Sequence, residues 1–211
     1  MGQKVAILLR RTASINRFRD IFEGCLKTLC IDRAVISSGF FRENTGFNAS
    51  HLFDLTPIRC ANPLELVFVG VYDYRAKPAF NTFVSNVQNS NCPFCVKVFK
   101  RMPKGLRWHA KTFIGSVNSK PRIGIIGSSN LTARAAGTST PFNYEADVVL
   151  WYDDDKEINA IISGQLANID NGSHEVIVTP YEQGGLNGNL SLENRLKNLE
   201  DEIISSSNLM P

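Results

Sequence analysis

The segment Trp108-His109-Ala110-Lys111-Thr112-Phe113-Ile114 and the later segment Ile123-Gly124-Ile125-Ile126-Gly127-Ser128-Ser129-Asn130 decide the fold of this chain. Each contains an apolar stretch of strand type. Between them, Asn118-Ser119-Lys120-Pro121 has the composition of a turn. The sequence therefore predicts a β-hairpin in which the numbers of paired residues add up to about 239.

In this register His109 pairs with Asn130, and Lys111 pairs with Ser128. Residues two apart on a strand point to the same face, so the four side chains gather on one face. Lysine supplies positive charge, Asn and Ser supply neutral donors, and an imidazole attacks or shuttles protons near neutral pH. These groups suit a bound phosphate. Glu145, on a later strand, is expected to accept a proton from the second ring nitrogen of His109 and to fix its tautomer.

Outward from the hairpin, the chain alternates predicted helices and strands, because apolar residues recur first at helical and then at strand spacing. The predicted helices span 14–29, 80–87 and 131–137, and the predicted strands span 33–37, 64–71, 95–99, 112–114, 123–126 and 146–151. The amides that open the helix at 131–137 are expected to add donors for an anion. This order predicts one α/β domain over 1–211, with its motif region at 108–151.

The C-terminal part predicts a helical extension at about 190–205. Leu192, Leu196, Leu199 and Ile203 recur there at steps of four, three and four. This apolar stripe either packs on its own domain or forms a dimer seam, and packing on the domain is favoured.

Composition and charge restrict the function without naming it. Lys and Arg number 23 against 20 Asp and Glu, so the net charge of +3 permits an anionic partner without requiring one. No apolar run approaches the roughly 18 residues that span a bilayer, and no signal peptide is recognisable. We therefore expect a soluble, cytoplasmic protein with no membrane partner.

The cysteines are expected to be reduced thiols, because they are odd in number and scattered through the chain. Cys92-Pro93-Phe94-Cys95 is one CxxC pair without a second pair. It is either part of a zinc site or a pair of buried thiols, and buried thiols are favoured. The run Asp153-Asp154-Asp155 predicts a solvated turn rather than a metal site.

The pattern His109-x-Lys111, Gly127-Ser128-x-Asn130 and Glu145 resembles the phospholipase D superfamily. Within it, the pattern is similar to the nuclease branch that includes the metal-independent type II restriction endonucleases. The resemblance implies a phospholipase D-like mixed sheet flanked by helices on both faces, and catalysis through a phosphohistidine without metal or other cofactor. It further implies that His109 is the nucleophile or the acid, that Lys111 and Asn130 bind phosphate oxygens, and that Ser128 and Glu145 support the histidine.

Two departures from the family pattern favour DNA over lipid as the substrate. The acidic residue that often follows the lysine by five positions is replaced by Ser116, and the gap before Gly127 is longer than in the phospholipases. The restriction-endonuclease branch shows the same departures. Hydrolysis or transfer on a lipid or another small phosphodiester is the first alternative, and a catalytically silent nucleic-acid-binding module is the second.

The resemblance also implies two histidines in the reaction, whereas this chain carries one motif. His51 and His174 are not followed by lysine two residues later. A homodimer that brings two copies of His109 together meets the requirement. Before the motif, Trp108 either stacks on a base or sugar or packs in the core. The basic residues Arg101, Lys104 and Arg107 either contact flanking phosphates of the substrate or lie in a solvated loop.

Overall fold

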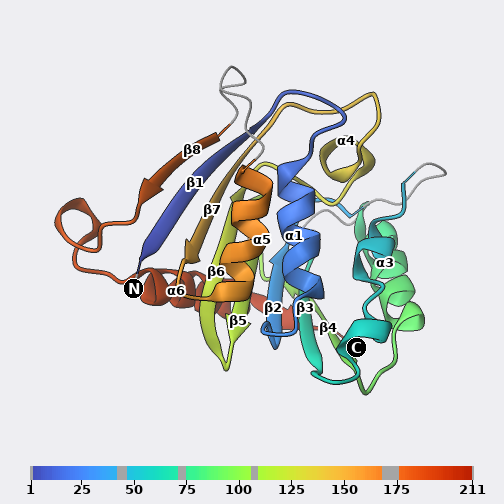
Figure 1. The fold of residues 1–211 in the computed structure, drawn as a ribbon. Helices are drawn as coiled ribbons and strands as arrows, with labels where there is room; N and C mark the ends of the chain where they lie inside the picture. Colours follow the sequence, from blue (N-terminus) through green and yellow to red (C-terminus); the bar gives the residue numbers. More distant parts are fainter. Residues whose placement is uncertain (1, 42–46, 71–74, 106–108, 168–175, 211) are drawn as a thin grey trace.

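The computed structural model describes residues 2–41, 47–70, 75–105, 109–167 and 176–210. They form a nine-stranded mixed sheet in the order β8-β1-β7-β6-β5-β2-β3-β4-β9 (Figure 1). The strands are β1 (Gln3–Arg10), β2 (Arg33–Ser37), β3 (Leu64–Val69), β4 (Val96–Pro103), β5 (Lys111–Val117), β6 (Lys120–Gly127), β7 (Glu145–Tyr152), β8 (Val176–Pro180) and β9 (Ser207–Leu209). The three strands β2, β3 and β4 run parallel, and the other pairings are antiparallel.

Helices cover both faces of this sheet, which confirms the predicted fold class. The α-helices are α1 (Arg17–Lys27), α2 (Thr56–Arg59), α3 (Lys77–Ser90), α4 (Ala133–Ala136), α5 (Lys156–Leu166) and α6 (Leu192–Ser205), and the 3-10 helices are η1 (Ala49–Phe53) and η2 (Gly185–Asn187). Figure 1 shows α1 and α5 side by side on one face and α6 crossing the other. None of the helices in the described ranges is long and apolar enough to cross a membrane.

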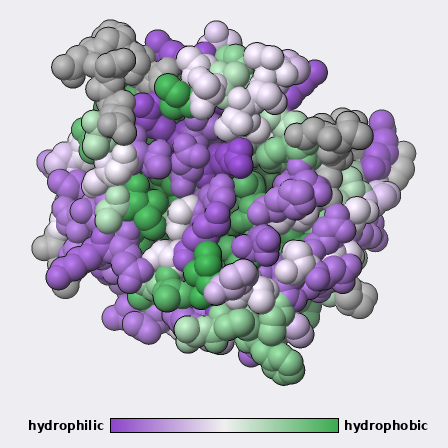
Figure 2. All heavy atoms as spheres, turned by 45° about the vertical axis from the view of Figure 1, so that its right-hand side comes forward, coloured by the Kyte–Doolittle hydropathy of each residue, from purple (hydrophilic) through white to green (hydrophobic). Residues whose placement is uncertain are grey.

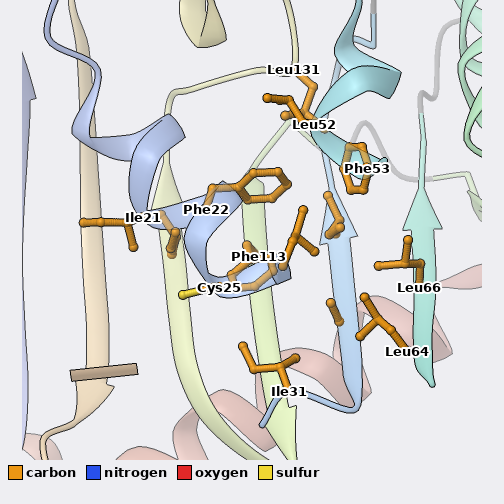
Figure 3. Packing of buried hydrophobic residues seen from close by; sticks show 14 of the residues in the cluster. Ile21, Phe22, Cys25, Ile31, Leu52, Phe53, Leu64, Leu66, Phe113 and Leu131 are labelled. Carbon is orange, nitrogen blue, oxygen red and sulfur yellow. The ribbon is translucent and has the colours of Figure 1, made fainter. Parts of the chain in front are cut away.

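The larger core lies between α1 and the sheet. Helix α1 begins after Asn16, whose side chain accepts a hydrogen bond from the Arg19 amide at 3.1 Å. Its buried residues include Phe22, whose ring packs edge-on against Phe113 of β5 at 5.2 Å between centroids (Figure 3). Because this cap and the extended backbone at Thr28 limit the helix, it is shorter at both ends than the predicted 14–29.

The second core lies under α6 and settles how the C-terminal extension packs. Leu192, Leu196 and Ile203 are buried against the sheet. A Cβ atom on Gly124 of β6 would lie 2.4 Å from Leu196 Cδ2, so the glycine permits the close approach. The apolar stripe therefore packs on its own domain, as the favoured alternative predicted.

The central hairpin has the predicted turn but a different register. Asn118 and Ser119 form a two-residue turn with φ of 51° and 64°, the backbone that matches the twist of paired strands. Lys111 pairs with Gly127, so the predicted pairing of Lys111 with Ser128 is wrong by one residue. The two-residue turn places Val117 opposite Lys120, and a bulge at Gly115 and Ser116 then leaves one extra residue, Arg122, on β6. Beyond the bulge the pairing lies one residue from the predicted one.

Two cysteine sulfurs lie close together, where α2 ends and β4 begins. Cys60 Sγ and Cys95 Sγ are 2.6 Å apart, and hydrogen bonding to Cys60 and then to Cys92 raises the pKa of the Cys95 thiol to about 12. Cys25 is buried in the larger core, and burial raises the pKa of its thiol as well. A raised pKa keeps these thiols protonated and unreactive at neutral pH.

Candidate active site

The candidate residues meet at one edge of the sheet, the upper edge in Figure 1. Strands β2 and β6 end there, and strands β5 and β7 begin there. Lys111 is the first residue of β5 and His109 lies two residues before it, Asn130 comes from the loop after β6, and Glu145 is the first residue of β7. His109 and Asn130 both lie outside the strands, so their predicted pairing within the hairpin is wrong.

His109 and Lys111 contact each other directly. Lys111 Nζ lies 2.8 Å from His109 Nδ1 and donates a hydrogen bond to the His109 carbonyl at 2.7 Å. The His109 side chain is exposed, whereas Lys111 is buried. Burial lowers the pKa of Lys111, and the negative charge of Glu145 acts in the opposite direction. A protonated lysine can only donate, so Nδ1 accepts and the ring proton lies on Nε2.

Asn130 is held with its amide nitrogen available for an acceptor. Its Oδ1 accepts a hydrogen bond from the Phe40 backbone amide at 3.1 Å and lies 3.1 Å from Ser38 Oγ. A backbone N–H can only donate, so the atom that faces Phe40 must be the carboxamide oxygen. The two N–H groups of Nδ2 are then left for a ligand oxygen, as the predicted phosphate-binding role requires.

The loop after β2 also approaches the histidine, and sequence reasoning did not assign it to the site. A Cβ atom on Gly39 would lie 3.7 Å from His109 Cδ2 and 3.6 Å from Asn130 Oδ1. Gly39 therefore lies between the two predicted functional side chains. The signal was present in Ser37-Ser38-Gly39, a run of small polar residues directly after a buried strand.

Glu145 does not contact His109 within one chain, contrary to prediction. It accepts a hydrogen bond from Ser128 Oγ and a second from Asn143 Nδ2 at 3.1 Å. Because β6 lies between β5 and β7, the two strands are about 10 Å apart. Ser128 likewise contacts Glu145 rather than the histidine, and its hydroxyl also accepts from the Ala146 amide at 3.0 Å.

A second serine and carboxylate pair, Ser129 and Asp147, follows the pair of Ser128 and Glu145 along the same two segments. Asp147 accepts from Ser129 Oγ at 2.6 Å and from the Ser129 amide at 3.2 Å. Burial raises the pKa of Asp147 to about 6, although these hydrogen bonds act to lower it. A Cβ atom on Gly127 would lie 2.1 Å from Asp147 Oδ1, so only glycine leaves room for this carboxylate.

Arg10 supports the loop between β6 and β7, and it too was missed from the sequence. Its guanidinium donates to the carbonyls of Arg134, Ala135 and Gly137 at 2.9, 2.6 and 2.8 Å. The side chain is buried, and burial lowers the pKa of Arg10 against the opposing charge of Glu145. These contacts hold α4, which has only four residues, in place at the edge of the site.

Of the two alternatives predicted for the basic residues before the motif, the solvated loop describes Lys104, which is exposed just after β4, whereas Arg101 lies within β4. Arg101 donates to the carbonyls of Ile204 and Ser207 at 2.9 and 2.7 Å, and Lys104 Nζ donates to the Ser205 carbonyl at 3.0 Å. Both side chains bind the C-terminal segment, and Lys104 remains exposed to solvent. Two further candidates, Arg107 and Trp108, lie outside the described residues.

No protein-family model matches the chain, and no curated protein matches it. Several solved structures are similar to it at low sequence identity. NucT from Helicobacter pylori is 14% identical at a TM-score of 0.45, and the match covers 78% of this chain and 94% of NucT. Phosphatidylserine synthase from Haemophilus influenzae is 13% identical at a TM-score of 0.49, and the match covers 96% of this chain and 46% of the synthase. A yeast tyrosyl-DNA phosphodiesterase mutant is 12% identical at a TM-score of 0.38, and the match covers 69% of this chain and 31% of the enzyme.

The chain spans less than half the length of the synthase and of the phosphodiesterase. Because every identity is below 25% and every TM-score is below 0.5, the case for a function rests on the residues of this chain.

Proposed function

We propose that this chain is a phospholipase D-like phosphodiesterase that acts as a metal-independent DNA endonuclease of the restriction type. One observation carries the proposal: Lys111 Nζ lies 2.8 Å from the His109 ring, at the same sheet edge as an Asn130 carboxamide whose oxygen is already occupied. A cation, an imidazole and an amide donor are the groups that a phosphodiester needs for binding and for nucleophilic attack.

The chemistry follows from these atoms. A phosphate between Lys111 and Asn130 draws the ammonium from His109 Nδ1 to a non-bridging oxygen, while Asn130 Nδ2 donates to another. Once the ammonium has left Nδ1, the ring can take a proton from water at Nδ1 and release its proton from Nε2, and it attacks phosphorus through the deprotonated Nε2. A nitrogen–phosphorus bond forms, and the bond from phosphorus to the leaving oxygen breaks. Water then cleaves the nitrogen–phosphorus bond and releases the histidine.

The leaving oxygen needs a proton, and we assign its donor to a second copy of His109 in a homodimer. His51, the other histidine in the described ranges, lies in η1 with Nε2 3.2 Å from Asn48 Nδ2. It is not part of the sheet edge that carries His109. A two-fold axis beside His109 would bring the two rings together and give one active site for two chains.

Metal independence is supported by how the carboxylates are used. Glu145 and Asp147 each accept hydrogen bonds from a serine, Ser128 and Ser129. Lys111 supplies positive charge at the same edge, which stabilises a phosphorane-like transition state without a further cation.

Cleavage of plasmid DNA in excess EDTA tests the proposal. We expect nicking or linearisation by the wild-type chain, and its loss in His109→Ala. His51→Ala is the matched control and should cleave like the wild type. A requirement for Mg²⁺ would contradict the mechanism, and cleavage by His109→Ala would contradict the assignment of the nucleophile.

Activity on a small phosphodiester distinguishes DNA from the alternative substrates. Bis(p-nitrophenyl) phosphate is expected to be hydrolysed slowly, with the same dependence on His109. If the chain hydrolyses this diester but leaves plasmid and oligonucleotides intact, the substrate is a small phosphodiester instead. If neither is cleaved, the chain is a silent binding module.

A further inference from the structure

Two exposed aromatic side chains border the candidate active site on opposite sides. Phe40 is 43% exposed and follows β2, and Tyr144 is 78% exposed and precedes β7. In the sheet order β7-β6-β5-β2, the strands that carry Lys111 and Gly127 lie between those that lead to the two rings. Three strand spacings separate the outer strands, a distance of about 14 Å.

Both aromatic residues are tied to the site rather than being isolated on the surface. The Phe40 amide donates to Asn130 Oδ1 at 3.1 Å, and the neighbouring Gly39 faces the His109 ring. On the other side, Tyr144 adjoins Glu145, which accepts the hydrogen bond from Ser128. A strand bound at the phosphate site would therefore extend towards both rings.

Among the described residues, the Tyr144 ring contacts one other aromatic ring, that of Phe142. Its centroid lies 5.6 Å from that of Phe142, and Arg10 Cζ lies 5.2 Å from the Phe142 centroid. Arg10 is in turn anchored by the carbonyls of Arg134 and Ala135. An aromatic ring that is braced from behind and 78% exposed offers its free face to another flat group.

We propose that Phe40 and Tyr144 stack on nucleobases on the two sides of the bound phosphate, and that the chain therefore binds unpaired nucleic-acid strands more tightly than duplex. The inference rests on the proposed function, because it takes the ligand at Lys111 to be a phosphodiester of a nucleic acid. Aromatic faces bind the bases of single strands with little regard to sequence. In a duplex the bases already stack on each other, and a base must be extruded at a cost of a few kcal/mol before it meets a protein ring.

One face of the molecule has a surface that suits a nucleic-acid strand better than a lipid. Figure 2 shows a face on which hydrophilic side chains predominate and apolar side chains form separate patches. A flexible polyanion that contacts the protein through phosphates and through single bases suits such a surface.

Binding measured without cleavage tests the inference. All variants carry His109→Ala, and their affinity is measured by fluorescence anisotropy with a labelled oligothymidine and with an abasic strand of the same length. Adding Tyr144→Ala or Phe40→Ala should weaken binding to oligothymidine by roughly 5- to 150-fold and leave binding to the abasic strand unchanged. Tyr144→Phe keeps the ring and should bind normally, whereas Phe40→Leu keeps apolar bulk and should weaken binding as Phe40→Ala does.

Two results would overturn the inference: equal weakening on both strands, or no weakening on either. A duplex competitor that binds as tightly as oligothymidine and is equally sensitive to Tyr144→Ala would overturn it as well. The outcome is separable from that of the proposed function. Base-dependent binding by a wild-type chain that cleaves nothing supports the stacking surface alone, and cleavage without base dependence supports the nuclease alone.

Discussion

At the scale of single residues, the site depends on which atoms are already occupied. Asn130 binds the Phe40 amide with its oxygen, and Lys111 contacts His109 before any substrate is present. The unoccupied donors on Asn130 Nδ2 and the exposed edge of the His109 ring are what a phosphate can meet. Substitutions that keep shape and change only a donor therefore test the assignment most directly.

Asn130→Asp is such a substitution. The carboxylate can still accept from the Phe40 amide, but it has no N–H to donate and it repels a phosphate. We expect kcat/KM on bis(p-nitrophenyl) phosphate to fall by about 100-fold or more, as for the loss of one transition-state donor. Asn194→Asp, on the exposed side of α6, is the control. Activity within a few-fold of wild type would remove Asn130 from the site.

Asp147 is expected to make the free energy of unfolding fall as the pH rises. The pKa of Asp147 is about 6 in the folded chain against an ordinary value of 3.8, so the folded state binds the proton more tightly. The stability that protonated Asp147 contributes is fully present below its ordinary pKa of 3.8. It is lost as the pH rises through the folded-state pKa of about 6. The loss amounts to about 3 kcal/mol in the free energy of unfolding.

Urea unfolding at pH 4, 5, 6 and 7 measures this dependence. Asp147→Asn keeps an oxygen for the Ser129 amide and has no charge, so it should gain stability relative to wild type as the pH rises from 4 to 7. Glu182→Gln, an exposed acid, should track the wild type. A constant difference between Asp147→Asn and wild type at all four values would contradict the assignment.

At the scale of elements, the sequence predicted local structure well and pairing less well. Periodicity found α1, α3 and α6, and the composition of 118–121 found the turn. The register was missed because the turn uses only two residues, Asn118 and Ser119, and because β6 carries one bulged residue next to it. At the bulge, a Cβ atom on Gly115 would meet the side chains of Ile123 and Ile31 at 2.8 and 2.9 Å. Such contacts exist only in the folded sheet, and no local pattern encodes them.

The same limit applies to the candidate site. His109 and Lys111 were found because they are two residues apart on one segment. The contact of Ser38 with Asn130 joins residues 92 apart, and that of Arg10 with Ala135 joins residues 125 apart. Strand β1, which carries Arg10, was not predicted, because its place in the sheet depends on its distant partners β7 and β8.

Gly127→Ala tests how tightly β6 and β7 approach each other. The added Cβ would lie 2.1 Å from Asp147 Oδ1 and 2.6 Å from the Ala146 carbonyl, so the strands must move apart. We expect a loss of about 1–3 kcal/mol, measured as a lower Tm. Gly164→Ala is the matched control: it lies in α5 with no atom within 4 Å of its Cβ, and it should raise stability by about 0.5–1 kcal/mol. Equal shifts of Tm would contradict this reading of the strand contact.

At the scale of the whole molecule, α6 and β9 complete the sheet within one chain. Helix α6 is used to cover its own core, and β9 pairs with β4 at one end of the sheet. The proposed dimer must therefore form elsewhere, and the sheet edge with His109 is the place where a second copy completes the chemistry.

Mixing wild type with His109→Ala tests the shared site. If two copies of His109 are needed, an equal mixture that has exchanged subunits should keep about one quarter of the activity of the same total amount of wild type. Independent sites would keep about one half. Sedimentation at micromolar concentration should show a dimer, and an active monomer would contradict the shared site.

The glycine beside the histidine offers a means of control that leaves the reactive groups intact. An added Cβ at Gly39 meets the His109 ring and Asn130 only at ordinary contact distance, so alanine fits without strain. A larger side chain there would stand in the path of an incoming phosphate. The size of residue 39 can thus set which substrates reach the nucleophile. Placing a larger side chain at this one position could give an enzyme that accepts only slender ligands.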